Sequence, residues 1–134
     1  GFTTAGAAVA VLARRASRLA ARHAPHAVDG RVFLVVHFEV KPANHTAFFA
    51  QFAPLLRESI REPGCIKYQM TRAEDGPPHT YTLLEEWESQ AALDRHNTLA
   101  HFTTHVPEMA KLAKVTTTKF EPFDAATMGR LLRE

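Results

Sequence analysis

Residues 32–41 (VFLVVHFEVK) constrain the fold most, because hydrophobic side chains alternate along them and Pro42 follows. Alternation with a period of two is typical of a β-strand. One face of this strand is wholly apolar and consists of Val32, Leu34, Val36, Phe38 and Val40. The other face mixes Phe33 and Val35 with the polar side chain of His37. We therefore expect helices to cover the first face, and a cavity or a partner to meet the second.

The rest of the chain repeats this strand pattern and places helical patterns between the strands. Strand patterns occupy residues 65–72, 80–88 and 114–123. Helical patterns occupy residues 44–61 and 90–97, and a further helical stretch runs to about residue 112. The first helix is expected to bury Phe48, Phe52, Leu55, Leu56 and Ile60. Pro54 and Pro107 are expected to kink or break these helices. The order strand, helix, hairpin, helix, strand predicts an α+β protein with the ferredoxin-like βαββαβ fold, an antiparallel four-stranded sheet with helices on one face.

The uncovered face of such a sheet determines how the protein assembles. The apolar side chains expected on it are Phe33, Val35, Leu83 and Trp87. This set is too apolar to face water. Packing two sheets face to face would bury it, so the sequence predicts a homodimer or a pseudo-dimer with a cavity between the two sheets. Glu85 shares a face with Trp87, and we expect it to bind a backbone group or a cation at the interface rather than to catalyse.

Residues 1–31 differ in composition from the rest of the chain. They carry five arginines and one acid, a charge of +4, whereas the remaining residues carry a charge of −2. An alanine- and arginine-rich, acid-poor amphipathic segment is typical of organelle transit peptides. We expect import into mitochondria or another organelle matrix, with a cytoplasmic location as the alternative. The arm could also dock in a multi-subunit protein complex.

The chain therefore divides into three parts: the arm, a domain over residues 32–123, and a tail over residues 124–134 with one short helix around 125–132. The mildly acidic domain offers no basic stripe, so nucleic acid is not an expected partner. No apolar run is long enough to span a membrane. Cys65 is the only cysteine, which excludes a disulfide framework and a cysteine-rich metal centre.

Three segments together resemble the antibiotic biosynthesis monooxygenase family of dimeric α/β barrels. They are Val40-Lys41-Pro42, then Glu62-Pro63-Gly64-Cys65 with Ile66 and Tyr68, and finally YTLLEEWESQAALDRHNTLAHF with Glu85, Trp87, Ala92, Leu93, His96, His101 and Phe102. The resemblance implies a homodimer with a small cavity. It also implies oxidation of quinols, anthrones or similar phenolics by O2 with no metal and no bound cofactor.

The resemblance places the catalytic group at His96, which matches the family histidine. A neutral imidazole suits the deprotonation of a phenol; the alternative role is a hydrogen bond at a helix end. Trp87 is expected to stack on an aromatic substrate or to anchor the dimer. His37 and Tyr68 are the other candidate substrate-binding residues. His101 and His105 have a spacing that permits metal binding, but no carboxylate lies near them in sequence, so we expect a solvated pair and no metal site.

Two functions follow from these observations. The first is a cofactor-independent monooxygenase that oxidises a quinol or polyphenol, with His96 as the base. The second is a non-catalytic accessory subunit that docks in a larger organellar assembly through its arm and its sheet face. In a dimer, an open pocket lined by His37, Trp87 and His96 would favour the enzyme. Filling of that space by side chains or by another polypeptide would contradict the enzyme.

Overall fold

The computed structural model describes residues 30–134, so most of the predicted arm lies outside the described residues. One compact unit spans Gly30–Pro122. Its elements are β1 (Val32–Val40), η1 (Pro42–Asn44), α2 (His45–Ser59), β2 (Cys65–Thr71), β3 (Thr80–Trp87), α3 (Gln90–His96), α4 (Ala100–Leu112) and β4 (Ala113–Phe120). The strands form one antiparallel sheet in the order β2-β3-β1-β4. This order confirms the ferredoxin-like α+β fold.

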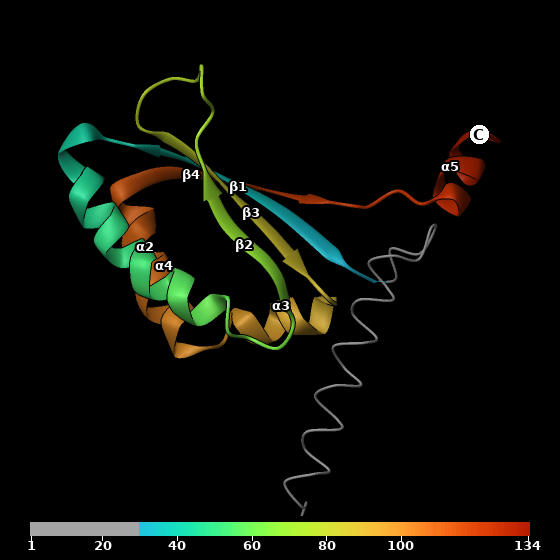
Figure 1. Ribbon diagram of the computed structural model, residues 1–134, viewed down its shortest axis with the longest axis horizontal. Coiled ribbons are helices and arrows are strands. Elements are labelled where there is room, and N and C mark those ends of the chain that lie inside the picture. The colour runs from blue at the N-terminus through green and yellow to red at the C-terminus, as the bar shows by residue number, and fades with distance from the viewer. Residues whose placement is uncertain (1–29) are drawn as a thin grey trace, which may run out of the picture. The chain divides into compact units, whose positions relative to one another are not determined.

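Helices α2 and α4 pack against each other over one face of the sheet, and α3 lies near one end of it (Figure 1). The apolar face of β1 points toward these helices, as the alternation predicted. Its residues are buried except Leu34, which is half-buried. Phe48, Phe52 and Leu55 of α2 are buried opposite them. Burying each such side chain contributes about 1.5–3 kcal/mol, so this two-layer core is the main source of stability.

Leu83 and Trp87 do not lie on the uncovered face, so that prediction is wrong. They pair with Val36 and Val32 of β1. Directly paired residues of antiparallel strands point to the same face of the sheet. Leu83 and Trp87 therefore face the helices, where they are 2% and 0% exposed. The alternation shows which β3 residues share a face, but Leu84 makes both faces partly apolar, so it does not show which face is covered.

The helices differ from the predicted ones at their prolines and ends. Pro54 lies inside α2 and Pro107 inside α4, and neither ends its helix. The break between α3 and α4 falls at residues 97–99, close to the predicted end of the first helical stretch near residue 97. Ser89 caps α3 by accepting a hydrogen bond from the backbone N–H of Ala92 at 3.1 Å. Ile60 follows the last residue of α2 and is 56% exposed, so it does not belong to the buried stripe.

The tail forms α5 (Ala125–Leu131), close to the predicted short helix. Asp124 caps it by accepting a hydrogen bond from the backbone N–H of Thr127 at 2.7 Å, and this bond lowers the pKa of the Asp124 carboxyl. Within residues 30–134 no helix combines the length and the apolar character that a membrane crossing requires.

Candidate functional site

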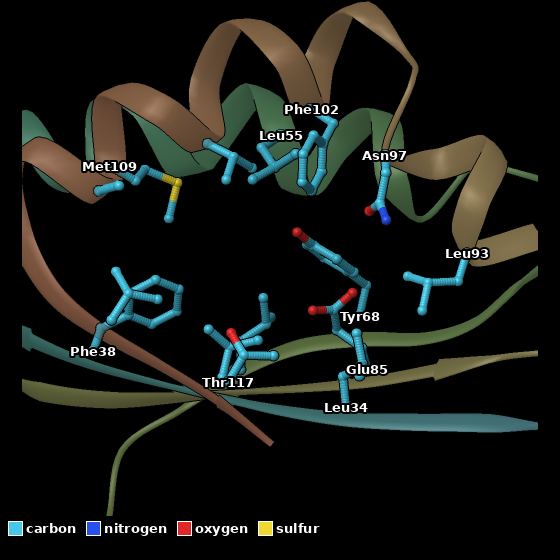
Figure 2. Close-up of a pocket in the computed structure, with 15 residues that line it drawn as sticks. Leu34, Phe38, Leu55, Tyr68, Glu85, Leu93, Asn97, Phe102, Met109 and Thr117 are labelled. Carbon is cyan, nitrogen blue, oxygen red and sulfur yellow. The ribbon is translucent and has the colours of Figure 1, made fainter. Parts of the chain in front are cut away.

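A cavity of about 240 Å³ lies between the helix-facing side of the sheet and helices α3 and α4 (Figure 2). Its walls are mostly apolar, and they include Leu34, Val36, Phe38, Leu83, Phe102, Val106 and Met109. This volume is slightly below the usual range for small-molecule sites, roughly 300–1,000 Å³, which favours a compact ligand. Ala110, Val115 and Thr117 border the cavity and are themselves exposed, so it meets solvent between α4 and β4.

Four polar side chains interrupt the apolar lining. Tyr68 comes from β2, Glu85 from β3, Asn97 from the turn after α3 and Thr117 from β4. Figure 2 shows the Tyr68 hydroxyl and the Glu85 carboxyl projecting into the same space, with the Asn97 amide at its edge. An apolar cavity with a few converging polar groups is the usual form of a small-molecule site.

Glu85 is the group in this cavity that is suited to proton transfer. It is 7% exposed. Burial raises the pKa of its carboxyl to about 7; the hydrogen bond from Trp87 opposes this rise, and the negative charge of Glu62 adds to it. The Trp87 indole N–H donates to Glu85 Oε1 at 3.0 Å and fixes the carboxyl orientation. Both protonation states are therefore populated at neutral pH, which is the condition for general acid–base work.

The raised pKa of Glu85 makes stability depend on pH. The carboxyl ordinarily titrates near 4.5 and does so near 7 in the folded chain. Between these values the folded chain binds more protons than the unfolded chain, so stability falls as the pH rises. From pH 5 to pH 7 this group should remove about 2 kcal/mol from the free energy of unfolding. In urea titrations, the free energy of unfolding of wild type should fall by this amount more than that of Glu85→Gln between pH 5 and pH 7. Equal pH dependence of the two free energies would contradict the raised pKa of Glu85.

Tyr68 complements Glu85 as a donor. It is 6% exposed, and burial raises the pKa of its hydroxyl far above the usual range, with the Glu85 charge as the second cause. The hydroxyl therefore stays protonated at physiological pH. Its ring stacks on Phe52 with the centroids 6.3 Å apart. A fixed, neutral O–H beside the cavity can donate a hydrogen bond to an oxyanion.

His96 lies outside the cavity lining. It is the last residue of α3 and is 1% exposed, and its ring packs on Trp87 with the centroids 4.4 Å apart. Its Nδ1 lies 2.6 Å from Glu62 Oε2. Burial lowers the pKa of the imidazole, and hydrogen bonding to Glu62 opposes this. The geometry favours the alternative role for His96, a hydrogen bond at a helix end.

His37 is on the opposite face of the sheet from the cavity. It is exposed, and its Nδ1 lies 3.3 Å from the Thr82 hydroxyl. Within one protomer it therefore does not join Tyr68 and Trp87 at one site. Trp87 itself is fully buried and contributes through the Glu85 carboxyl rather than as an exposed stacking surface.

The histidines of α4 also differ from the expected solvated pair. His101 Nε2 lies 2.8 Å from Glu62 Oε2, and His105 Nδ1 lies 2.8 Å from Gln51 Oε1. Both rings are half-buried. The carboxylate that the sequence did not reveal near His101 is Glu62, 39 residues earlier in the chain. The fold brings it there because the turn after α2 meets the start of α4.

The protein is a ferredoxin-like domain with a mostly apolar cavity that can hold a small molecule. The sequence model of the antibiotic biosynthesis monooxygenase family matches residues 31–108. The chain belongs to this family.

Relatives of known structure and sequence agree with this membership. YcnE, a candidate monooxygenase from Bacillus subtilis, is 30% identical over 81 residues, which are 60% of this chain and 84% of YcnE. A candidate antibiotic biosynthesis monooxygenase from Caulobacter crescentus is 26% identical, with 71% of this chain and 92% of that chain covered and a TM-score of 0.64. SnoaB, a cofactor-independent oxygenase from Streptomyces nogalater, shares the fold at 22% identity, with 70% and 94% covered and a TM-score of 0.62.

Proposed function

We propose that this protein is a cofactor-independent monooxygenase that oxidises a small quinol, anthrone or similar phenolic with O2. The observation that carries the proposal is that the Glu85 carboxyl lines an apolar cavity and has a pKa of about 7. Family membership and the description of SnoaB as a cofactor-independent oxygenase support the reaction type. The volume and apolar lining of the cavity support an aromatic substrate of one or a few rings.

In the proposed reaction, Glu85 accepts the proton of the substrate, and the Tyr68 hydroxyl donates a hydrogen bond to the resulting oxyanion. The electron-rich anion then transfers an electron to O2, and the two radicals combine at carbon. For an anthrone the balance is one CH2 group plus O2 giving one C=O group plus water. The proton that Glu85 accepted returns to the departing oxygen as water forms. The apolar walls lower the local dielectric constant around the substrate, which strengthens both polar contacts.

Blocking the cavity tests the substrate site. Val106 lines the cavity, and Val106→Trp should fill much of the space. We expect kcat/KM for oxygen uptake with a hydroquinone and anthrone series to fall at least about tenfold, because the substrate loses its site. Thr104→Trp, on the exposed side of the same helix, is the matched control and should leave the rate unchanged. Equal rates in all three proteins would place the substrate elsewhere.

We also propose that the uncovered sheet face forms a homodimer. Phe33, Val35, Phe120 and Pro122 line an apolar groove on this face, and Phe120 is 49% exposed. Val35→Asp should convert a dimer to a monomer in sedimentation experiments, because a charge would be buried at the interface. Ile60→Asp changes an exposed apolar residue after α2 and should leave the dimer intact. A monomeric wild type at micromolar concentration would refute this assembly.

The organellar location and the accessory-subunit role are proposals that rest on the composition of residues 1–31. Of the arm, the structure describes Gly30 and Arg31. The Arg31 guanidinium Nη1 lies 2.9 Å from Glu86 Oε1. Import of a fusion carrying residues 1–31 into isolated mitochondria tests the location. Absence of import removes this proposal and leaves the cytoplasm as the alternative.

A further inference from the structure

Glu62, His96 and His101 form a cluster that the proposed oxidation does not use. Glu62 lies in the turn after α2, His96 ends α3, and His101 is the second residue of α4. None of the three lines the cavity. They come from three separate segments and meet at the end of the helical layer.

The cluster is compact and largely removed from solvent. His96 Nδ1 and His101 Nε2 approach the same oxygen, Glu62 Oε2, at 2.6 and 2.8 Å. The side chains of His96, Glu62 and His101 are 1%, 9% and 15% exposed. All three potential ligand atoms lie within 4.8 Å of one another. Three long side chains held this closely differ from the loosely solvated groups of an ordinary surface.

Two imidazole nitrogens and one carboxylate oxygen are a common set of ligands for Zn²⁺. Ligand atoms about 2.0–2.1 Å from a tetrahedral ion lie roughly 3.3 Å apart, so the nitrogens need move from the oxygen by only about 0.6 Å. Each imidazole can transfer its ring proton to the other nitrogen, so the hydrogen-bonded and metal-bound states differ by a tautomer change.

We propose that Glu62, His96 and His101 bind one divalent transition-metal ion of the Zn²⁺ type, with water in the fourth position. The partial exposure of His101 leaves a side from which the ion and the water can approach. Such an ion would join the turn after α2 to α3 and α4 and so stabilise the end of the helical layer. None of the three ligands lines the cavity, so this inference does not rest on the proposed oxidation.

Calorimetric titration of metal-free full-length protein with ZnCl2, without a histidine tag, tests the site. We expect one equivalent of Zn²⁺ per chain and, at free Zn²⁺ about 100-fold above the dissociation constant, a rise in Tm of roughly 10 °C. Co²⁺ should give the absorption of a four-coordinate ion. His101→Gln should abolish Zn²⁺ binding, the rise in Tm and the Co²⁺ absorption. The glutamine amide can still donate a hydrogen bond to Glu62, so the loss would reflect the missing ligand.

His105→Gln is the matched control, because His105 lies four residues along the same helix and contacts Gln51 instead of the cluster. The His105→Gln variant should still bind one equivalent of Zn²⁺ per chain. Glu62→Gln should weaken binding at least tenfold by removing the charged ligand. The inference is overturned if wild type binds no Zn²⁺ equivalent, or if His101→Gln binds it as well as wild type. Because every readout is metal binding, failure of the oxidation proposal would leave this result unaffected.

Discussion

Glu85→Gln is expected to lower kcat/KM for oxygen uptake with a quinol or anthrone by about 100-fold or more, the usual contribution of a general base. Glutamine has nearly the same shape and can still interact with the Trp87 indole, but it cannot accept the substrate proton. The cavity lining and the Tyr68 hydroxyl stay in place. Oxygen-electrode rates at saturating O2 measure the effect.

Glu86→Gln is the control for this substitution. Glu86 is the next residue along β3, points to the opposite face of the sheet and pairs with Arg31. The Glu86→Gln variant should take up oxygen at the wild-type rate. If both variants react at the wild-type rate, Glu85 is not the base, and the basis of the proposed mechanism is lost.

Trp87→Ala is expected to lower the free energy of unfolding by about 3–5 kcal/mol, the range for removing a large buried aromatic side chain. Trp87 is fully buried, packs on His96 and Tyr68, and donates to Glu85. The truncation leaves a cavity and removes the donor that orients the carboxyl. Urea unfolding followed by circular dichroism measures the loss, because Trp87 is the only tryptophan and its fluorescence disappears with it.

Trp87→Phe separates the two roles of this residue. Phenylalanine keeps most of the packing, so the stability loss should be smaller than for alanine. In wild type the indole N–H donates to Glu85 and lowers the pKa of its carboxyl. Phenylalanine has no such donor, so the pKa of Glu85 should rise further. A loss below about 1 kcal/mol in Trp87→Ala would show that the residue is not part of the core.

The sequence predicted the fold well because its strongest signals are local. The alternation over residues 32–41 and the proline after it each act within a few residues, and the structure bears them out, with a strand over Val32–Val40 and a short helix that starts at Pro42. The hairpin predicted from the strand patterns over residues 65–72 and 80–88 is also confirmed, because β2 and β3 pair antiparallel. Local patterns of this kind determine the order of elements, from which the sheet follows.

The candidate site was less predictable because it depends on pairing across the sheet. Which face of β3 is covered follows from the pairing of Val36 with Leu83 and of Leu34 with Glu85, which no local pattern contains. The same pairing places Glu85 on the helix-facing side of the sheet, where it lines the cavity, and not at the dimer interface that the sequence predicted. The raised pKa of Glu85 follows from burial. The Glu62–His96–His101 cluster joins residues up to 39 positions apart, a separation at which single-sequence spacing gives no signal.

The pH dependence of kcat/KM for oxygen uptake, measured with one anthrone from pH 5 to pH 9, tests the central claim most directly. The account predicts a rate that rises with pH through a single ionisation near 7, as the Glu85 carboxyl loses its proton and becomes a base. The inflection should be absent from the residual activity of Glu85→Gln. Absence of oxygen uptake, or a wild-type profile that is flat through pH 7, would contradict the account.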